Sequence, residues 1–357
     1  MMLTDIAKVL IPATISFFIG IVFTFPWANF LYKNEMWKKK AKDISFDGTG
    51  TPIFNQLHKE RETQVPRLGG VVIWFSVLLS TLLVVFLDKA TPFQFFDKLD
   101  FLSRDQTWIP LSVLILGAFV GFVDDYLEIK GNSTYKVGGL SLKKRLFFVG
   151  LCAFLVSLWF YFKLDVDSIN IPFWKELFLG YWFIPFFVLV ALAVYAGGII
   201  DGLDGLAGGV FGSIFLAYAG IAFHQNQINL SAFCAVVAGA ILAFLWFNIP
   251  PARYYMTETG SMALTLALTV VAFMSDTLGD GYGVSVLPII ALPLFVTALS
   301  VIIQVLSKKF RGKKVFLVAP MHHHFEAIGW PAYKVVMRYW VISIILSVIG
   351  MIIAFIA

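Results

Sequence analysis

The sequence YWFIPFFVLVALAVYAGGII, residues 181–200, continues directly into DGLDGLAGG, residues 201–209. The first stretch carries no charged side chain over 20 residues, a length that crosses the hydrocarbon core of a bilayer as a helix. The second stretch places two carboxylates, Asp201 and Asp204, among four glycines before the next apolar stretch begins. Together they predict a membrane-spanning helix that ends at an acidic, glycine-rich break.

The composition of the whole chain indicates a membrane protein. Hydrophobic residues make up 59% of the 357 residues and charged residues 14%, whereas soluble domains carry about 25% charged residues. Ten stretches are apolar and long enough to cross a bilayer: residues 6–31, 71–88, 108–124, 146–162, 181–200, 206–223, 230–248, 261–277, 285–306 and 335–356. Pro288 and Pro293 should bend the ninth. We therefore predict an all-α polytopic membrane protein that forms a single domain over residues 1–357.

The basic residues are distributed as a membrane topology requires. A formal net charge of +5 would suit a nucleic-acid partner if the basic side chains formed one patch. Instead, 21 of the 27 Lys and Arg residues fall on one set of connecting loops. Because cytoplasmic loops are rich in Lys and Arg, this set is predicted to be cytoplasmic and both termini to lie outside. No nucleic-acid partner is expected.

Carboxylates gather on the predicted cytoplasmic side. The third stretch ends in Asp124, Asp125 and Tyr126, and two adjacent ionised carboxylates need a cation, a metal or a shared proton. Asp201 and Asp204 are three residues apart and would share one face of a helical turn. The glycines beside them would let the backbone approach a phosphate closely. Simpler interpretations stay open, namely a solvated helix end for the first pair and an N-cap of the next helix for Asp204.

Two later segments add polar residues to the same side. Asn248 ends the seventh stretch and Glu258 precedes the eighth, so both lie at the mouths of helices. Three consecutive histidines, residues 322–324, follow a basic run over residues 308–314. Beside the carboxylates, these cations and imidazoles suit an anionic substrate, and a diphosphate would draw Mg²⁺ to the acids. The basic run could also hold the chain to an anionic lipid leaflet.

The order of these motifs resembles a known family. Asp-Asp-Tyr at 124–126, Asp-Gly-Leu-Asp-Gly-Leu-Ala at 201–207, Phe-Leu-Trp-Phe-Asn at 244–248 and Ala-Pro-Met-His-His-His-Phe-Glu at 319–326 cover almost the whole chain. The pattern is similar to the polyprenyl-phosphate N-acetylhexosamine-1-phosphate transferase superfamily. The histidine segment, with Gly329-Trp330 after it, most resembles the muramoyl-pentapeptide branch of that superfamily.

The resemblance implies an activity, a cofactor and partners. The family branch transfers phospho-MurNAc-pentapeptide from UDP-MurNAc-pentapeptide to undecaprenyl phosphate, requires Mg²⁺, and releases lipid I and UMP. It works in the bacterial cytoplasmic (inner) membrane, at its cytoplasmic face. The expected partners are therefore the two substrates, membrane lipid and, by resemblance only, a second copy of the chain in a homodimer.

The resemblance also implies roles for individual residues. The catalytic group would comprise Asp124, Asp125, Asp201, Asp204, His323 and His324. Substrate binding would involve Lys59, Arg61, Arg67, Lys143, Arg145, Asn248 and His322. The Mg²⁺ ligands would be Glu258 and Asp201.

Some positions depart from the family pattern, and two other functions stay open. Glu258 stands where the family has Asp, and Tyr195 and Gly198 stand where it has two Asn. Arg67 follows Pro66 as in the GlcNAc-1-phosphate branch, so a polyprenyl-phosphate GlcNAc-1-phosphate transferase that initiates a surface polysaccharide is the first alternative. An ion or metal transporter is the second, although transporter ligands usually lie near the bilayer midplane. The acids of this chain gather instead at one membrane face.

Overall fold

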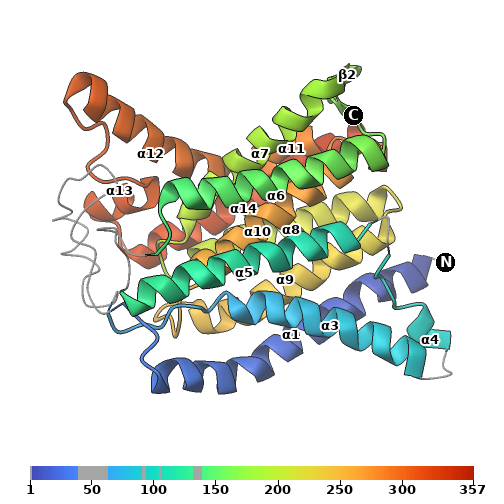
Figure 1. Ribbon diagram of the computed structural model, residues 1–357, viewed down its shortest axis with the longest axis horizontal. Helices are drawn as coiled ribbons and strands as arrows, with labels where there is room; N and C mark the ends of the chain where they lie inside the picture. Colours follow the sequence, from blue (N-terminus) through green and yellow to red (C-terminus); the bar gives the residue numbers. More distant parts are fainter. Residues whose placement is uncertain (1, 39–62, 91–93, 104–105, 132–138) are drawn as a thin grey trace.

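The computed structural model describes residues 2–38, 63–90, 94–103, 106–131 and 139–357. Its helices are α1 (Met2–Lys33), α3 (Val71–Ala90), α4 (Gln94–Asp97), α5 (Trp108–Lys130), α6 (Leu142–Lys163), α7 (Phe183–Gly197), α8 (Leu206–His224), α9 (Ile228–Asn248), α10 (Thr257–Met274), α11 (Gly283–Ile290), α12 (Leu292–Arg311), α13 (Met321–Ala327) and α14 (Ala332–Ile356). Strands β1 (Ser168–Asn170) and β2 (Glu176–Phe178) pair in an antiparallel hairpin between α6 and α7. The helices run side by side as one bundle (Figure 1).

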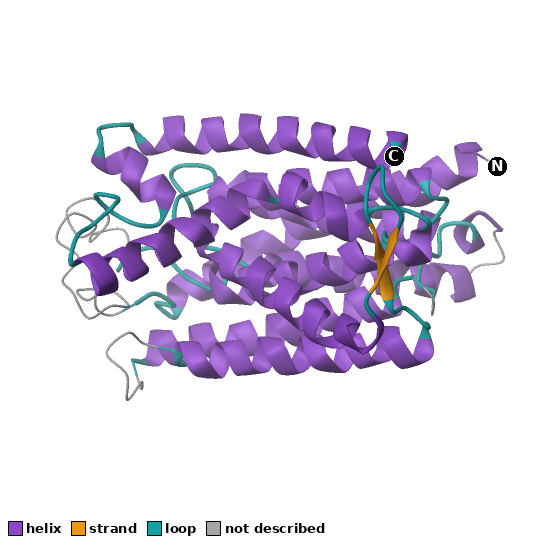
Figure 2. Cartoon of the chain, turned by 90° about the horizontal axis from the view of Figure 1, so that it is seen from above, coloured by secondary structure: helices purple, strands orange, loops and turns teal. Residues whose placement is uncertain are grey.

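The bundle confirms the prediction of a polytopic membrane protein. Among the described residues, ten helices are long and apolar enough to cross a membrane, and each corresponds to one predicted stretch. Both termini and the β1–β2 hairpin lie at one end of the bundle (Figure 2), which we call the terminal end. Helix α13, which carries the three histidines, lies at the opposite end (Figure 1), which we call the site end.

Helix α10 forms the centre of the bundle. Of the residues in its apolar segment, 94% are buried, against 22% in α1, α6 and α14, which face outward. Small residues let neighbouring backbones approach it: a Cβ added to Gly121 of α5 would lie 2.2 Å from the Glu258 carbonyl oxygen. A Cβ on Gly70, just before α3, would lie 2.3 Å from the Gly260 nitrogen. This close packing fixes the first turn of α10 against α5 and the chain leading into α3.

The ninth predicted span is two helices rather than one bent helix. Helix α11 ends at Ile290, and α12 begins at Leu292 with Pro293 in its first turn. Proline fits the start of a helix because the missing N–H has no partner there in any case. Figure 1 shows that α12 then projects away from the bundle toward the site end.

Two helix boundaries differ from the prediction in a way that matters for the site. Helix α5 continues past Asp124 to Lys130, and Gly131 ends it with a left-handed φ of 64°. Asp124 and Asp125 therefore lie within the helix, not after it. Helix α10 begins at Thr257, so Glu258 belongs to its first turn rather than to a loop.

Candidate active site

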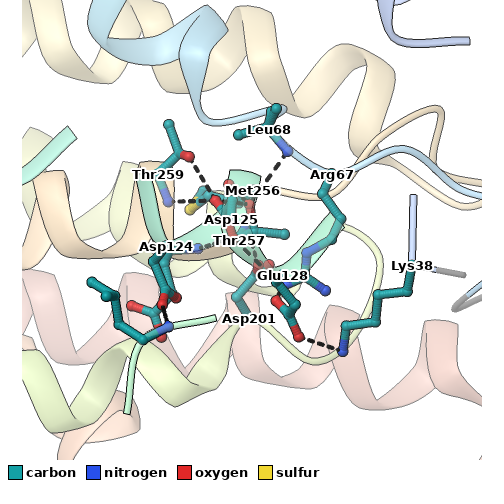
Figure 3. A network of polar contacts seen from close by, with 12 residues as sticks. Lys38, Arg67, Leu68, Asp124, Asp125, Glu128, Asp201, Met256, Thr257 and Thr259 are labelled. Carbon is teal, nitrogen blue, oxygen red and sulfur yellow. Dashed lines mark hydrogen bonds and ion pairs between the residues drawn. The ribbon is translucent and has the colours of Figure 1, made fainter. Parts of the chain in front are cut away.

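Four of the predicted carboxylates meet at the site end. The last turns of α5 carry Asp124 and Asp125, and they lie beside the first turn of α10, which carries Glu258. Asp201 follows the short 3₁₀ turn Gly198–Ile200 that ends α7. Figure 3 shows Asp124, Asp125 and Asp201 directed into one polar network with Thr257.

Asp125 is buried and connects α5 to α10 within this network. One of its carboxylate oxygens accepts hydrogen bonds from the Thr257 hydroxyl at 2.5 Å, the Thr259 hydroxyl at 2.6 Å and the Thr259 N–H at 2.8 Å. Its side chain has no exposed surface. The first N–H groups of a helix have no partner within the helix, and Asp125 provides one for α10. The simpler alternative, that Asp125 lies at a solvated helix end, is therefore wrong.

Basic side chains line one edge of the network. Arg67 Nη2 lies 2.6 Å from Glu128 Oε2 and 3.5 Å from Asp125 Oδ1. Lys38 Nζ lies 2.9 Å from Glu128 Oε1. The backbone around Arg67 is held in place because the Tyr255 N–H donates to the Pro66 carbonyl at 2.9 Å. Arg67 therefore reaches the acidic cluster, and its role in substrate binding stays a prediction.

Arg145 links the two remaining carboxylates of α5 and α10. Its Nη1 contacts Glu258 Oε1 and lies 3.7 Å from Asp124 Oδ2. The Tyr195 hydroxyl of α7 donates to Glu258 Oε2 at 3.3 Å, and the Leu140 N–H donates to Asp124. The Glu258 side chain is 23% exposed, whereas that of Asp124 is 4% exposed. Glu258 is thus the more accessible of the two carboxylates to a ligand.

The two aspartates after α7 bind the backbone that leads into α10. Asp201 Oδ2 accepts from the Thr257 N–H at 2.7 Å, and Asp204 Oδ2 accepts from the Ala252 N–H at 3.1 Å. Burial raises the pKa of Asp201 to about 6, although the Thr257 N–H opposes this shift. The alternative that Asp204 caps α8 is wrong, because Gly205 holds the N-cap position with a φ of 80°.

Asn248 has a structural position rather than an open one. Its side-chain oxygen accepts from the Gly205 N–H at 2.9 Å, and its amide nitrogen donates to the Tyr254 carbonyl at 2.8 Å. The side chain is buried. One end of the amide therefore holds the Asp204–Gly205 turn against the end of α9, and the other holds the segment that leads to α10.

The histidine helix packs onto the turn that carries Asp201. A Cβ added to Gly202 would lie 2.3 Å from His322 Nε2 and 3.0 Å from His323 Nε2. His323 Nδ1 lies 2.7 Å from Glu326 Oε2, which fixes the orientation of the ring. His324 Nδ1 instead accepts from the Leu317 N–H at 3.3 Å. The structure thus brings His322 and His323 to the Asp201 turn, while His324 faces the preceding loop.

Two of the predicted cations fall outside the described residues, a third is exposed, and two residues of the site were not predicted. Lys59 and Arg61 lie outside the described residues, and Lys143 is exposed in the first turn of α6. Tyr195 and Glu128 join the site but were not predicted. The signal for Glu128 was its spacing three and four residues after Asp125 and Asp124, which places it on the same helix face.

The donor set fits Mg²⁺. Five carboxylates, of Asp124, Asp125, Glu128, Asp201 and Glu258, meet three cations, of Lys38, Arg67 and Arg145. By formal charge, the carboxylates exceed the cations by two. Within the part of the chain that the structure describes, no group of three or more His, Cys, Asp or Glu residues is arranged to hold a metal. Mg²⁺ commonly uses only one or two carboxylates together with water and substrate phosphate, so this arrangement suits it.

Comparison with known proteins identifies the family. Residues 107–276 match the model of glycosyl transferase family 4. A phospho-N-acetylmuramoyl-pentapeptide-transferase of Dichelobacter nodosus is 36% identical over 82% of this chain and 80% of its own length. Proteins of the same name from Rickettsia massiliae and Chloroflexus aurantiacus are 33% and 31% identical over 86% and 99% of this chain, and 85% and 91% of their own lengths. The chain belongs to the phospho-N-acetylmuramoyl-pentapeptide-transferase family.

Membership of this family makes the chain a phosphoglycosyl transferase. The resemblance found in the sequence is confirmed. The matched residues 107–276 include all four predicted carboxylates of the network together with Asp204. The cluster described above is accordingly the candidate active site of a phospho-N-acetylmuramoyl-pentapeptide-transferase family member.

Proposed function

We propose that the chain transfers phospho-MurNAc-pentapeptide from UDP-MurNAc-pentapeptide to undecaprenyl phosphate in a Mg²⁺-dependent reaction. The products are lipid I and UMP. The reaction takes place at the cytoplasmic face of the bacterial cytoplasmic membrane. The printed name of the relatives supports the activity. The observation that carries the location is the meeting of the carboxylates at one end of the membrane-spanning helices, on the side to which the Lys and Arg distribution assigns the cytoplasm.

The chemistry asks mainly for alignment and charge neutralisation. An oxygen of the lipid phosphate attacks the phosphorus that carries the sugar, and the bond from that phosphorus to the UMP oxygen breaks. The attacking phosphate oxygen is already ionised at neutral pH, so a strong general base is not required. Positioning the two phosphates and stabilising the charge on the departing UMP supply most of the rate enhancement.

The cations and the accessible carboxylates divide this work. Arg145 lies between Asp124 and Glu258 and would contact the phosphate of the lipid or of the donor. Glu258, the accessible carboxylate, and Asp201 would hold Mg²⁺, and the metal would neutralise charge on the diphosphate. Asp124 would orient the attacking lipid phosphate through Arg145. Asp125 would keep α5 and α10 in register, because its contacts are with α10.

The histidines would contact the donor on the opposite side of the Asp201 turn. Glu326 holds His323 through Nδ1, so Nε2 is directed to Gly202. A diphosphate or sugar bound over this turn would lie within reach of His322 and His323. His324 would act indirectly, through its bond to the Leu317 N–H.

The test is release of UMP with two donors. The detergent-purified protein is given undecaprenyl phosphate and Mg²⁺, with UDP-MurNAc-pentapeptide in one assay and UDP-GlcNAc in the other. Release with the muramoyl donor alone is the expected result. The Asp124→Asn variant serves as the matched inactive control, because Asn can still accept the Leu140 N–H. Release with neither donor would contradict the proposal.

One observation favours a second candidate. Arg67, the residue that resembles the GlcNAc-1-phosphate branch, lies at the edge of the cluster and contacts Glu128 and Asp125 directly. A GlcNAc-1-phosphate transferase would release UMP with UDP-GlcNAc alone. The same pair of assays therefore separates the two candidates.

A further inference from the structure

A buried polar stripe runs along one face of α12. Ser300, Gln304 and Ser307 are spaced by four and three residues, so they lie above one another on the helix. Their exposed fractions are 1%, 6% and 8%. The outer face of the same helix is apolar and exposed, as at Ile302 and Phe310. Buried polar side chains need hydrogen-bond partners, so the stripe must have some.

The central partner of the stripe is the backbone of the segment that returns from α12. The Gln304 side-chain oxygen accepts from the N–H groups of Val315 and Phe316, both at 3.0 Å. The side-chain nitrogen of Gln304 donates to the Phe316 carbonyl at 2.8 Å. Residues 312–320 form neither helix nor strand. One side chain therefore supplies three bonds that secondary structure would otherwise provide.

The two serines extend this attachment in both directions. The Ser307 hydroxyl donates to the Lys313 carbonyl at 2.9 Å, and the Ser300 hydroxyl accepts from the Met321 N–H at 2.9 Å. The stripe and the return segment thus run antiparallel, with Gln304 in the middle. Met321 is the first residue of α13, so the attachment ends where the histidine helix begins.

The attachment sets the position of the imidazoles. Helix α13 has seven residues and contacts the Asp201 turn so closely that a Cβ on Gly202 would lie 2.3 Å from His322 Nε2. The segment before α13 is held by α12, and His324 adds a bond back to that segment through the Leu317 N–H. A shift of the return segment would consequently move His322 and His323 relative to Asp201.

We infer that Gln304 is a positioning residue, which holds His322 and His323 against the Asp201 turn through the backbone of residues 315–316. The effect of Gln304 on catalysis rests on the proposed function. The effect of Gln304 on the placement of α13 is independent of it. The test therefore includes one measurement that needs no activity and one that does.

The first measurement is the reactivity of the histidines toward diethyl pyrocarbonate, located by mass spectrometry in the detergent-purified full chain. His322 and His323 are buried, and His224 at the terminal end is exposed and serves as the internal reference. Gln304→Leu removes all three bonds at similar volume. It should raise the modification rate of His322 and His323 at least fivefold relative to His224. Gln304→Glu keeps an acceptor for the two N–H groups and should give a smaller increase.

A matched control separates positioning from general loosening. Gln227 is also a buried glutamine, 7% exposed, and its side chain donates to the Met274 carbonyl at 2.9 Å at the terminal end. Gln227→Leu should leave the His322 and His323 rates at the wild-type value. Ser300→Ala removes only the bond to the Met321 N–H and provides a milder variant should Gln304→Leu not fold. An equal rise in Gln227→Leu and Gln304→Leu would overturn the inference.

The second measurement divides the kinetic effect. Gln304→Leu should lower kcat for UMP release at least tenfold and leave the KM for undecaprenyl phosphate unchanged, because the displaced groups lie on the donor side. Gln304→Glu should restore part of kcat. Unchanged histidine reactivity and unchanged kcat in Gln304→Leu would overturn the inference. A wild-type protein that releases no UMP would contradict the proposed function instead. The reactivity comparison would still decide whether Gln304 holds α13 against the Asp201 turn.

Discussion

The Thr257 hydroxyl donates to the Asp125 carboxylate at 2.5 Å and so joins the last turns of α5 to the first turn of α10. The Thr257 N–H donates at the same time to Asp201 at 2.7 Å. One residue thus connects three of the elements that build the site. Its φ of 56° is rare for a β-branched residue and costs of the order of 1–3 kcal/mol. The two carboxylates offset that cost.

Removing the Thr257 hydroxyl should weaken this junction. Thr257→Val keeps the branched shape but removes one hydrogen-bond donor to Asp125. We therefore expect the free energy of unfolding to fall by about 1–3 kcal/mol. Thr257→Ser keeps the hydroxyl and should stay close to wild type. The measurement is thermal unfolding in detergent. Thr269→Val is the matched control, because Thr269 is buried in the same helix and its hydroxyl donates to the Thr265 carbonyl within that helix. Equal losses in the two valine variants would contradict the role of Thr257.

Asp124 should be needed for turnover rather than for folding. Asp124→Asn keeps an oxygen that can accept the Leu140 N–H but removes the charge beside Arg145. We expect kcat for UMP release to fall about 100-fold or more, with the melting temperature near that of wild type. Asp125→Asn should behave differently, because Asn would direct an N–H toward donors of α10, and it should lower the melting temperature as well. If Asp124→Asn turned over at the wild-type rate, Asp124 would have no part in the mechanism.

Asp276 should make stability depend on pH at the terminal end. It is buried in the loop after α10, and its carboxylate accepts the N–H groups of Asn170 at 2.7 Å and Val284 at 2.9 Å. Burial raises its pKa from 3.8 to about 7 in the folded protein. The folded state therefore binds the proton more tightly than the unfolded state. The stability from this group is fully present below the unfolded pKa and is lost as the pH rises through about 7.

The expected result for Asp276 is a melting temperature that falls as the pH rises from about 4 to about 7 and levels off at higher pH. Asp276→Asn cannot titrate and should flatten this part of the curve. Asp280 lies in the same loop and is exposed, so Asp280→Asn should leave the slope unchanged. A wild-type slope that persists in Asp276→Asn would assign the pH dependence to another group.

The spans could be predicted because crossing a membrane depends on local composition. About 20 apolar residues are enough to define each one, and all ten were found. The break of the ninth span was predicted only as a bend, because Pro288 and Pro293 show where a helix is weak but not how far its halves separate. Neighbouring helices decide that separation, and their contacts are not written in the local sequence.

The sequence named most of the polar residues that the structure brings together, but not Tyr195 or Glu128 and not the contacts between them. Asp125 and its donor Thr257 are 132 residues apart, so nothing local indicates that this carboxylate caps α10. Asp204 is a residue type that often caps a helix, yet the N-cap of α8 is Gly205. The three histidines belong to a short helix, in which successive side chains point about 100° apart. His324 therefore points about 200° away from His322, toward the loop.

Glu258 should set the Mg²⁺ requirement. Its side chain is 23% exposed, and Arg145 and Tyr195 hold its two oxygens. Glu258→Gln removes a charge that the cation needs while keeping the length and the polar contacts of the side chain. We expect the Mg²⁺ concentration for half-maximal UMP release to rise about tenfold or more, since loss of even an indirect metal contact typically costs 10–100-fold. Tyr195→Phe removes only one hydrogen bond to Glu258 and should shift the titration much less. An unchanged Mg²⁺ titration in Glu258→Gln would place the metal on other residues, because a carboxylate ligand cannot be neutralised without loss of affinity.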